Sequence, residues 1–302
     1  MDLKIQAAAE RHLEQALRQH ARARQIEEGA VVVMRYDGAV VALVGGRDYK
    51  QKEWDHATQA RRQPGSVAKL FVYLAALQEG STPDTTVSDA ALTLGGRPVR
   101  NFDDRYLGDI SLSAALEKSP NTASVRLAMQ NTTAVRALIK ALNVGSNLES
   151  EAGDLALGTY EAKLVDLTAA FACVANRGRM VVPYSVQRVQ DPTGAEILVR
   201  VLPAGSDIRQ TIKPQHADLM RQMLSGVVQR GTGKAADPGF WAVGKTGTTT
   251  ASRDAWFVGF TEQYVAGVWL GNSDSTPMLG VSSGGLPAQI WRSIMIDAVR
   301  SA

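Results

Sequence analysis

Three short strings of the sequence contain the residue types that an acyl-transfer enzyme needs when histidine is not its base. They are Ser-Val-Ala-Lys at residues 66–69, Ser-Pro-Asn at residues 119–121 and Lys-Thr-Gly-Thr at residues 245–248. A serine hydroxyl is a poor nucleophile at neutral pH and must lose its proton to a nearby base. A lysine can be that base once burial or a neighbouring cation lowers its pKa. One helical turn between Ser66 and Lys69 would place both side chains on the same face of a helix.

The three strings differ in how specific they are. A Ser-x-x-Lys string is expected about once by chance in a chain of this length, and Ser-x-Asn is equally common. Lys-Thr-Gly-Thr is expected in roughly one such chain in a few hundred, so its presence with the other two, in this order, carries the argument. The Pro-Gly pair before Ser66 and the apolar run after it predict a turn and then a buried helix over residues 66–79. A helix N-terminus at Ser66 favours a developing negative charge, whereas the simpler interpretation is an ordinary N-cap.

With these strings, the chain resembles the transpeptidase domain of penicillin-binding proteins, most closely the class A subgroup that pairs this domain with a glycosyltransferase. Further segments at residues 57–66, 231–236 and 254–259 read like this subgroup, and the resemblance covers nearly the whole chain. One departure is Leu70, which stands where these proteins usually carry proline. Because position 70 lies in the first turns of the predicted helix, we expect leucine to be tolerated there.

The resemblance implies a D,D-transpeptidase that cross-links peptidoglycan stem peptides through a serine acyl-enzyme and that is acylated by β-lactam antibiotics. Ser66 would attack a donor peptide that ends in D-Ala-D-Ala, and the acyl group would pass to an amine of a neighbouring stem peptide. Lys69 would be the base, and Ser119 would relay the proton to the departing nitrogen. The backbone N–H groups of Ser66 and Thr248 would form the oxyanion hole.

Five further residues would bind the substrate in this scheme. Asn121 offers an amide donor and acceptor suited to the donor's backbone amide. The cation of Lys245 and the hydroxyls of Thr246 and Thr248 suit the terminal carboxylate. Gly247 would let the substrate lie against its strand without an intervening side chain. A cation at Lys245 would also depress the pKa of the neighbouring catalytic lysine.

Two other functions remain open at this stage. A serine β-lactamase shares the three strings but adds an activated water that hydrolyses the acyl-enzyme, and no carboxylate dedicated to that step is identifiable in the sequence. A penicillin-binding sensor, or a binding module without turnover, would bind or be acylated and do nothing more. Such a module often lacks a catalytic group, whereas each of the three strings is complete here.

Composition sets limits on other functions. The chain has 302 residues, of which 45% are hydrophobic and 21% charged, and its formal net charge is +3. This composition can bury a large core. We expect no nucleic-acid partner, because no basic run is interleaved with aromatic residues. The four histidines lack metal-ligand spacing, so we expect no metal and no cofactor. Cys173 is the only cysteine, which excludes an intrachain disulfide.

The sequence shows no apolar run long enough for a membrane span, and the N-terminal segment reads as an amphipathic helix. The resemblance implies that a full-length protein carries a membrane anchor and a glycosyltransferase domain that this chain lacks. It would act at the outer, extracytoplasmic face of the cytoplasmic membrane. We therefore divide the chain into an N-terminal linker helix, residues 1–28, and a transpeptidase (penicillin-binding) domain, residues 29–302.

The order of elements predicts an α+β fold, with one antiparallel five-stranded sheet built from both chain ends and covered by helices on both faces. The resemblance adds an all-helical lobe with the active site between lobe and sheet, as in penicillin-binding proteins and serine β-lactamases. Asp37-Gly38 marks a hairpin between the first two strands. Residues 81–110 read as a loop. Predicted strands span 30–36, 39–44, 241–248, 255–261 and 264–270, with a second hairpin near 184–201. Predicted helices span 2–25, 66–79, 111–118, 122–129, 132–142, 163–177, 214–229 and a last one from about 287.

Overall fold

The computed structural model describes residues 1–48, 53–145, 148–149, 151–200, 209–282 and 284–301. Its helices are α1 (Leu3–Arg24), α2 (Lys69–Gln78), α3 (Leu112–Lys118), α4 (Asn121–Gln130), α5 (Thr132–Ala141), α6 (Ala152–Leu157), α7 (Leu164–Ala175), α8 (Pro214–Gln229) and α9 (Leu286–Ser301). Three short 3-10 turns are η1 (Gly65–Ala68), η2 (Lys234–Ala236) and η3 (Thr250–Ser252). The strands are β1 (Glu28–Arg35), β2 (Val40–Val44), β3 (Thr86–Asp89), β4 (Leu92–Leu94), β5 (Arg97–Val99), β6 (Gly108–Ser111), β7 (Arg188–Gln190), β8 (Glu196–Val199), β9 (Val243–Thr248), β10 (Asp254–Phe260) and β11 (Tyr264–Gly271).

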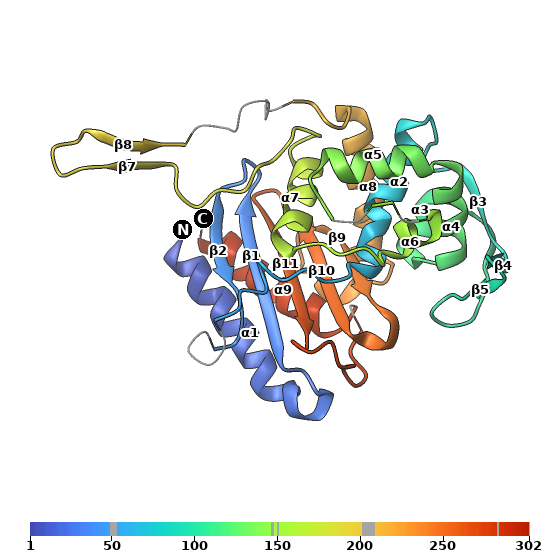
Figure 1. Ribbon diagram of the computed structural model, residues 1–302, viewed down its shortest axis with the longest axis horizontal. Helices are drawn as coiled ribbons and strands as arrows, with labels where there is room; N and C mark the ends of the chain where they lie inside the picture. The colour runs from blue at the N-terminus through green and yellow to red at the C-terminus, as the bar shows by residue number, and fades with distance from the viewer. Residues whose placement is uncertain (49–52, 146–147, 150, 201–208, 283, 302) are drawn as a thin grey trace.

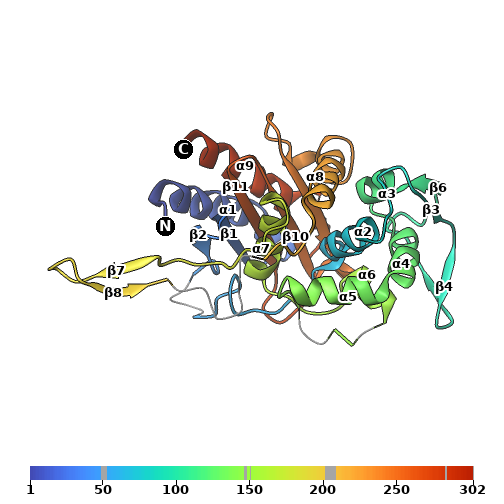
Figure 2. The ribbon, with the colours of Figure 1, turned by 90° about the horizontal axis from the view of Figure 1, so that it is seen from above.

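The central sheet has five antiparallel strands in the order β2-β1-β11-β10-β9, so strands from both ends of the chain lie side by side (Figure 1). This arrangement confirms the predicted α+β fold. The hairpin between β1 and β2 turns at Asp37-Gly38, where Gly38 has a φ of +90°. A positive φ is a conformation that glycine adopts without steric cost. The strand β9 forms one edge of the sheet and faces the helical lobe (Figures 1 and 2).

Helices cover both faces of the sheet (Figure 2). Alternate residues of β1 belong to different hydrophobic clusters, because successive side chains of a strand point to opposite faces. Val31 and Val33 pack in the cluster that holds α1 and α9, whereas Val32 packs in the cluster that holds α7 and the helical lobe. On β11, Ala266 accepts a hydrogen bond of 3.0 Å from the buried indole of Trp291 in α9. The sheet is therefore the wall between two cores.

Helix α1 packs against α9 and covers the edge strand β2. Its buried face includes Leu13 and Leu17. The side-chain amide of Gln6 forms two hydrogen bonds with the backbone of Leu43, one to the carbonyl oxygen at 2.9 Å and one from the N–H at 2.8 Å. These bonds occupy backbone groups that an edge strand would otherwise present to solvent. The helix thus shares a core with the sheet, while the division of the chain at residue 28 stays a prediction.

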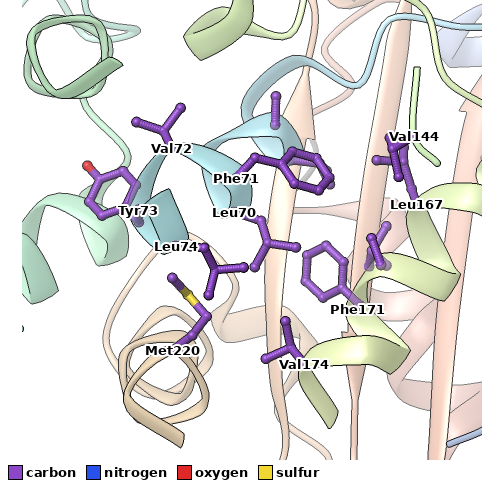
Figure 3. Close-up of a cluster of buried hydrophobic side chains, with 14 of the residues drawn as sticks. Leu70, Phe71, Val72, Tyr73, Leu74, Val144, Leu167, Phe171, Val174 and Met220 are labelled. Carbon is purple, nitrogen blue, oxygen red and sulfur yellow. The ribbon is translucent and has the colours of Figure 1, made fainter. Parts of the chain in front are cut away.

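The helical lobe is built around α2, whose residues from Lys69 to Leu77 are all buried. Leu70 has no exposed surface, and in Figure 3 it and Leu74 point toward a cluster that includes Phe171 of α7 and Met220 of α8. Leucine is thus accommodated at position 70 by packing against the sheet-covering helix. Burial on every side fixes the axis of α2, and with it the direction in which its first residue points.

Two regions differ from the sequence-based expectations, and a third, the second hairpin, is present as predicted. Residues 81–110 were predicted as loop, but β3 pairs with β6 and β4 with β5 there, in strands of three or four residues. Helix α6 was not predicted. The second hairpin exists as β7 and β8 and projects from the body as a two-stranded arm (Figure 1). Residue 201, at the end of the range predicted for it, lies outside the described residues. No helix of the described residues has the length and apolar character to cross a membrane.

Candidate active site

The candidate nucleophile, Ser66, lies in the 3-10 turn η1, which runs directly into α2. The backbone N–H of Lys69 donates to the carbonyl oxygen of Ser66, so serine and lysine lie one turn apart. The side chain of Ser66 is half-buried, and its hydroxyl forms no hydrogen bond with the described residues. Nothing in this part of the chain therefore ties the hydroxyl down. Catalytic hydrogen bonds are often absent or long in a free enzyme and form when substrate binds.

Glycines bring the segment before Ser66 into backbone contact with the edge strand β9. Gly65 has a φ of +54°, and a Cβ there would lie 2.6 Å from the carbonyl oxygen of Thr248. A Cβ on Gly247 would lie 2.4 Å from the carbonyl oxygen of Pro64. Both distances are shorter than real Cβ contacts. Only glycine therefore permits this approach, which puts the backbone of Ser66 beside the end of β9.

A buried ion pair and an indole hold the same segment on the sheet. Arg62 and Asp254, both nearly inaccessible, form an ion pair of 2.7 Å between Nε and Oδ1. The indole N–H of Trp256 donates to the carbonyl oxygen of Gln63 at 2.9 Å. Removing one partner of a buried ion pair leaves an uncompensated charge and is strongly destabilising. The backbone that leads to Ser66 is therefore fixed at residues 62, 63 and 65.

Lys69 is fully buried and reaches the turn between α3 and α4. Its Nζ donates to the carbonyl oxygen of Ser119 at 2.6 Å and to Asn121 Oδ1 at 2.9 Å, and it lies 3.1 Å from Ser119 Oγ. Three oxygen atoms match the three N–H groups of an ammonium. They equally match a neutral amine that donates to the carbonyl and the amide and accepts the Ser119 hydroxyl proton into its lone pair.

Ser119 takes a left-handed backbone conformation, with φ at +60° and ψ at +37°, as the residue that ends α3. Its N–H donates to the carbonyl oxygen of Ala115 at 2.9 Å, as in a left-handed helix C-cap. Glycine is the usual residue in this conformation, which costs a residue with a Cβ roughly 1–2 kcal/mol. Strain of this kind clusters at functional sites, and here it turns the hydroxyl toward two lysines.

Lys245 approaches the same hydroxyl from the sheet. It lies in β9, is fully buried, and its Nζ donates to Ser119 Oγ at 3.0 Å and to the carbonyl oxygen of Thr246 at 3.2 Å. The hydroxyl of Thr246 in turn lies 2.8 Å from that of Thr232. Lys69 and Lys245, from a helix and a strand 176 positions apart in the sequence, therefore meet at one oxygen.

Burial shifts the pKa values of both lysines in the same direction. Burial lowers the pKa of Lys69 well below its ordinary value, the positive charge of Lys245 lowers it further, and the carboxylate of Asp89 opposes both effects. Burial lowers the pKa of Lys245 to about 7. Burial therefore leaves Lys69 with a strongly lowered pKa. This is the property that a lysine base requires.

Asn121 opens helix α4 and is held at both ends of its side chain. Its Oδ1 accepts from Lys69, and its Nδ2 donates to the carbonyl oxygen of Arg100 at 2.8 Å. Its backbone N–H donates to Asn101 Oδ1 at 2.7 Å. Asn121 can therefore hold the lysine amine, while its amide group has limited freedom to turn.

The structure brings the sequence-predicted residues together at the junction of α2, the α3–α4 turn and β9. Hydrogen bonds join five of them directly, namely Lys69, Ser119, Asn121, Lys245 and Thr246. The other three lie where the backbone of η1 meets β9, namely Ser66, Gly247 and Thr248. The roles given to these eight residues stay predictions.

Sequence reasoning missed Asp89, Asn101 and Thr232 as members of this site. Thr232 lies in the Gly-Thr-Gly string at 231–233, and those flanking glycines were a signal that could have drawn attention to it. Asp89 and Asn101 are single polar residues in a segment that reads as loop, so the sequence carried no signal for them. Among the described residues, no group of three or more His, Cys, Asp or Glu side chains could hold a metal ion.

Comparison with known proteins gives this arrangement a family. The family model described as "Penicillin binding protein transpeptidase domain" matches residues 29–295. Penicillin-binding protein 1A of Rickettsia conorii is 33% identical over 318 aligned residues, which cover 95% of this chain and 40% of the relative. Penicillin-binding protein 1A of Neisseria meningitidis serogroup A is 36% identical over 286 residues, covering 90% of this chain and 36% of the relative. The chain thus spans about two fifths of the length of these relatives.

Solved structures agree. The PonA1 protein of Mycobacterium tuberculosis, in a complex with penicillin V, superposes with a TM-score of 0.86 at 27% identity, covering 100% of this chain and 85% of that one. Penicillin-binding protein 1A of Haemophilus influenzae superposes with a TM-score of 0.80 at 26% identity, covering 90% of this chain and 47% of that one. The motif strings, the five-stranded sheet with its helical lobe and these matches lead to one conclusion. The chain belongs to the family of penicillin-binding protein transpeptidase domains.

Proposed function

We propose that this chain is a D,D-transpeptidase that cross-links peptidoglycan stem peptides through an acyl-enzyme on Ser66. The observation that carries the proposal is that Lys69 and Lys245 both lie within hydrogen-bond distance of Ser119 Oγ. Lys69 is in turn one helical turn from Ser66. An amine with a lowered pKa can accept a proton, and a second amine can bind an anion. The hydroxyl between them can pass a proton on.

The reaction begins with attack of Ser66 Oγ on the carbonyl carbon of the penultimate D-alanine of the donor peptide. The hydroxyl proton passes to Lys69, and a proton passes by way of Ser119 to the nitrogen of the terminal D-alanine as its C–N bond breaks. The amine of a second stem peptide then attacks the ester carbonyl. This step forms the new amide bond and returns a proton to Ser66. Backbone N–H groups of Ser66 and Thr248 are the proposed oxyanion hole, which the contact between Gly65 and Thr248 supports.

Substrate binding is assigned to the strand β9 and to α4. Lys245, with the hydroxyls of Thr246 and Thr248, would bind the terminal carboxylate. Gly247, the second-last residue of β9, would serve this site by letting the backbone of Pro64 approach the strand. Asn121 would hold the donor's backbone amide. A β-lactam presents a strained amide and a carboxylate in a related arrangement, so we propose that it acylates the same serine.

The proposal differs from a β-lactamase in the lifetime of the acyl-enzyme, which a β-lactamase hydrolyses rapidly. Among the described residues, no carboxylate forms a hydrogen bond or ion pair with Ser66, Lys69 or Asn121. In this part of the chain, no carboxylate is thus bonded to the candidate nucleophile, base or amide as a ready base for a hydrolytic water. This observation supports transfer to an amine over rapid hydrolysis.

The relatives suggest the wider setting of the chain. They are about two and a half times as long as the segment they share with it. We propose that a full-length protein adds a glycosyltransferase domain and a membrane anchor, and that it works at the outer face of the cytoplasmic membrane. The linker helix at residues 1–28 would join this domain, residues 29–302, to the remainder.

A donor–acceptor assay tests the proposed reaction. The purified chain is incubated with a stem peptide that ends in D-Ala-D-Ala and with a labelled amine acceptor, and both released D-alanine and the amide product are measured. We expect equal amounts of D-alanine and amide product, and neither with Ser66→Ala. D-alanine without the amide product would indicate a hydrolase. Acylation by a penicillin without either product would indicate a binding module, and both outcomes would contradict the proposal.

A further inference from the structure

A buried carboxylate and a buried amide connect strand β3 to the α3–α4 turn. Asp89, the last residue of β3, has no exposed surface. Its Oδ1 accepts from Asn101 Nδ2 at 2.8 Å and from the hydroxyl of Thr122, and its Oδ2 accepts from the N–H of Leu107 at 2.9 Å. No lysine or arginine of the described residues forms an ion pair with Asp89. A buried carboxylate with three donors and no ion pair calls for an explanation.

Asn101, which is bonded to Asp89, also forms hydrogen bonds with the start of α4. Its Oδ1 accepts from the backbone N–H groups of Asn121 at 2.7 Å and Thr122 at 3.2 Å. These are the first two N–H groups of a helix, which have no partner within it. The preceding residue, Pro120, has no side-chain acceptor with which to cap them. Asn101 therefore caps α4 from 20 residues away in the sequence, and Asp89 holds the cap in place.

The hydrogen bonds continue from α4 to the amine of Lys69. Asn121 Oδ1 accepts from Lys69 Nζ at 2.9 Å, and the side chain of Asn121 is further held by the carbonyl oxygen of Arg100. A chain of direct hydrogen bonds thus leads from Asp89 through Asn101 and Asn121 to the candidate base. Each link is a short contact between groups that are mostly buried, so displacement of one end moves the other.

We propose that Asp89 and Asn101 are positioning residues for the acylation of Ser66, because they fix the first turn of α4 and thereby the contact between Asn121 and Lys69. This inference rests on the proposed transpeptidase function. The charge of Asp89 has a second consequence. It opposes the burial and the Lys245 charge that depress the pKa of Lys69, so it limits how far that pKa falls.

Other charged groups near this chain of bonds act elsewhere. Lys245 approaches Lys69 from β9, as described above. Arg126 of α4 donates to the carbonyl oxygens of Ser88, Ala90 and Ala91, close to Asp89 in the chain, and forms no hydrogen bond with Asn121 among the described residues. On α2, the hydroxyl of Tyr73 pairs with Ser124, and burial raises its pKa to a range in which it stays neutral during catalysis. Asp89 is thus the carboxylate that acts on Lys69, and Arg126, which donates from α4 to the backbone beside Asp89, offers a matched control.

The test compares rates and end points of acylation by a chromogenic penicillin in the variants Asn101→Ala, Asp89→Asn and Arg126→Met. The first-order acylation rate constant reports on positioning, whereas the final labelled fraction and the melting temperature report on folding. We expect Asn101→Ala to lower the rate constant about 10- to 100-fold at full final labelling, since misplacement by about 1 Å can cost that much. Arg126→Met should lower the melting temperature and leave the rate constant unchanged.

A reciprocal exchange provides rescue. In the double variant Asp89→Asn with Asn101→Asp, the hydrogen bond between the two side chains and the acceptor for the α4 N–H groups are both retained. We expect it to acylate faster than Asn101→Asp alone, in which two carboxylates face each other. The proposal is overturned if Asn101→Ala lowers only the labelled fraction, or if Arg126→Met slows the rate constant as much as Asn101→Ala does.

A titration of Lys69 separates this inference from the proposed function. The ¹³Cε resonance of Lys69, identified by its loss in Lys69→Met, is followed against pH in the free protein. Both Asp89→Asn and Asn101→Ala should lower the pKa of Lys69, because each removes support for its charged form. An unchanged titration in both variants would overturn the inference even if the wild type is acylated. A wild-type chain that no penicillin acylates would overturn the proposed function, while the shift in the titration would still support the hydrogen-bonded link.

Discussion

Lys69 and Lys245 approach the same hydroxyl oxygen, Ser119 Oγ, at 3.1 and 3.0 Å, and both side chains are fully buried. A hydroxyl has a single proton, so it can donate to one amine while it accepts from the other. With Lys69 neutral and Lys245 charged, Ser119 accepts from Lys245 and donates to the lone pair of Lys69. This arrangement is a proton path that needs no histidine.

Removal of the Lys69 amine should stop acylation without unfolding the chain. Lys69→Met keeps most of the buried side-chain volume and removes the base, whose contribution is typically about 10²- to 10⁴-fold in rate. We expect acylation by a penicillin to slow by that factor and the circular dichroism spectrum to match that of the wild type. Stopped-flow or mass-spectrometric kinetics measures the rate. An acylation rate equal to the wild-type rate would remove Lys69 from the role of base.

The two lysines should give acylation a bell-shaped dependence on pH. The rate should rise with pH as Lys69 loses its proton, because only the neutral amine accepts one. It should fall as pH passes the pKa of Lys245, about 7 in the free protein, because the neutral amine no longer attracts the carboxylate. The ratio of acylation rate constant to dissociation constant, measured from pH 5 to 10, checks both limbs.

An arginine tests the assignment of the descending limb. In Lys245→Arg the cation persists at every accessible pH, since the guanidinium pKa exceeds 12. We expect the descending limb to disappear while the ascending limb remains. A descending limb that stays in place in this variant would show that another group causes it.

The left-handed backbone of Ser119 predicts that two substitutions which both remove the hydroxyl differ in stability. Ser119→Gly removes the hydroxyl and relieves the strain of the +60° φ, whereas Ser119→Ala removes the hydroxyl and keeps the strain. We expect the glycine variant to be more stable by about 1 kcal/mol, as urea denaturation would measure. Both variants should acylate far more slowly than the wild type. Equal stabilities would contradict the strain, and unimpaired acylation would contradict the relay.

Gly65 should be needed for its lack of a side chain in addition to its backbone angle. In Gly65→Ala the new Cβ would lie 2.6 Å from the carbonyl oxygen of Thr248, and η1 would have to move away from β9. Gly95→Ala is a matched control, because Gly95 has nearly the same φ of +53° but nothing within 4 Å of the added atom. We expect Gly65→Ala to slow acylation by about 10²-fold or more and Gly95→Ala to leave it unchanged. Similar rates in both variants would contradict the contact.

Much of the fold could be predicted because its elements are long and regular. Four strands of the sheet, β1, β2, β10 and β11, carry apolar runs, and the Asp37-Gly38 turn set the pairing of the first two. The fifth, β9, has no such run and contains the Lys-Thr-Gly-Thr string. The strands β3 to β6 were missed because three or four residues are too few to show a period. Helix α6 has only six residues, and its stability comes from packing against α4.

The sequence predicted the residues of the candidate site but not the residues that hold them in place. Lys69, Ser119 and Lys245 belong to strings whose order is informative, so the sequence indicated them before any coordinates. The hydrogen bonds that link Asp89 to Asn101 and Asn101 to Asn121 join residues 12 and 20 positions apart, and such contacts leave no local pattern. The left-handed turn at Ser119 was likewise invisible, because serine there gives no sign of a positive φ.

Intact-mass spectrometry with a penicillin, followed by peptide mapping, tests the central claim most directly. We expect the chain to gain the mass of one penicillin, to keep it for longer than the measurement takes, and to carry it on Ser66. Ser66→Ala should gain no mass. An adduct on another residue, an adduct that survives Ser66→Ala, or no adduct on a folded wild-type chain would each contradict the account.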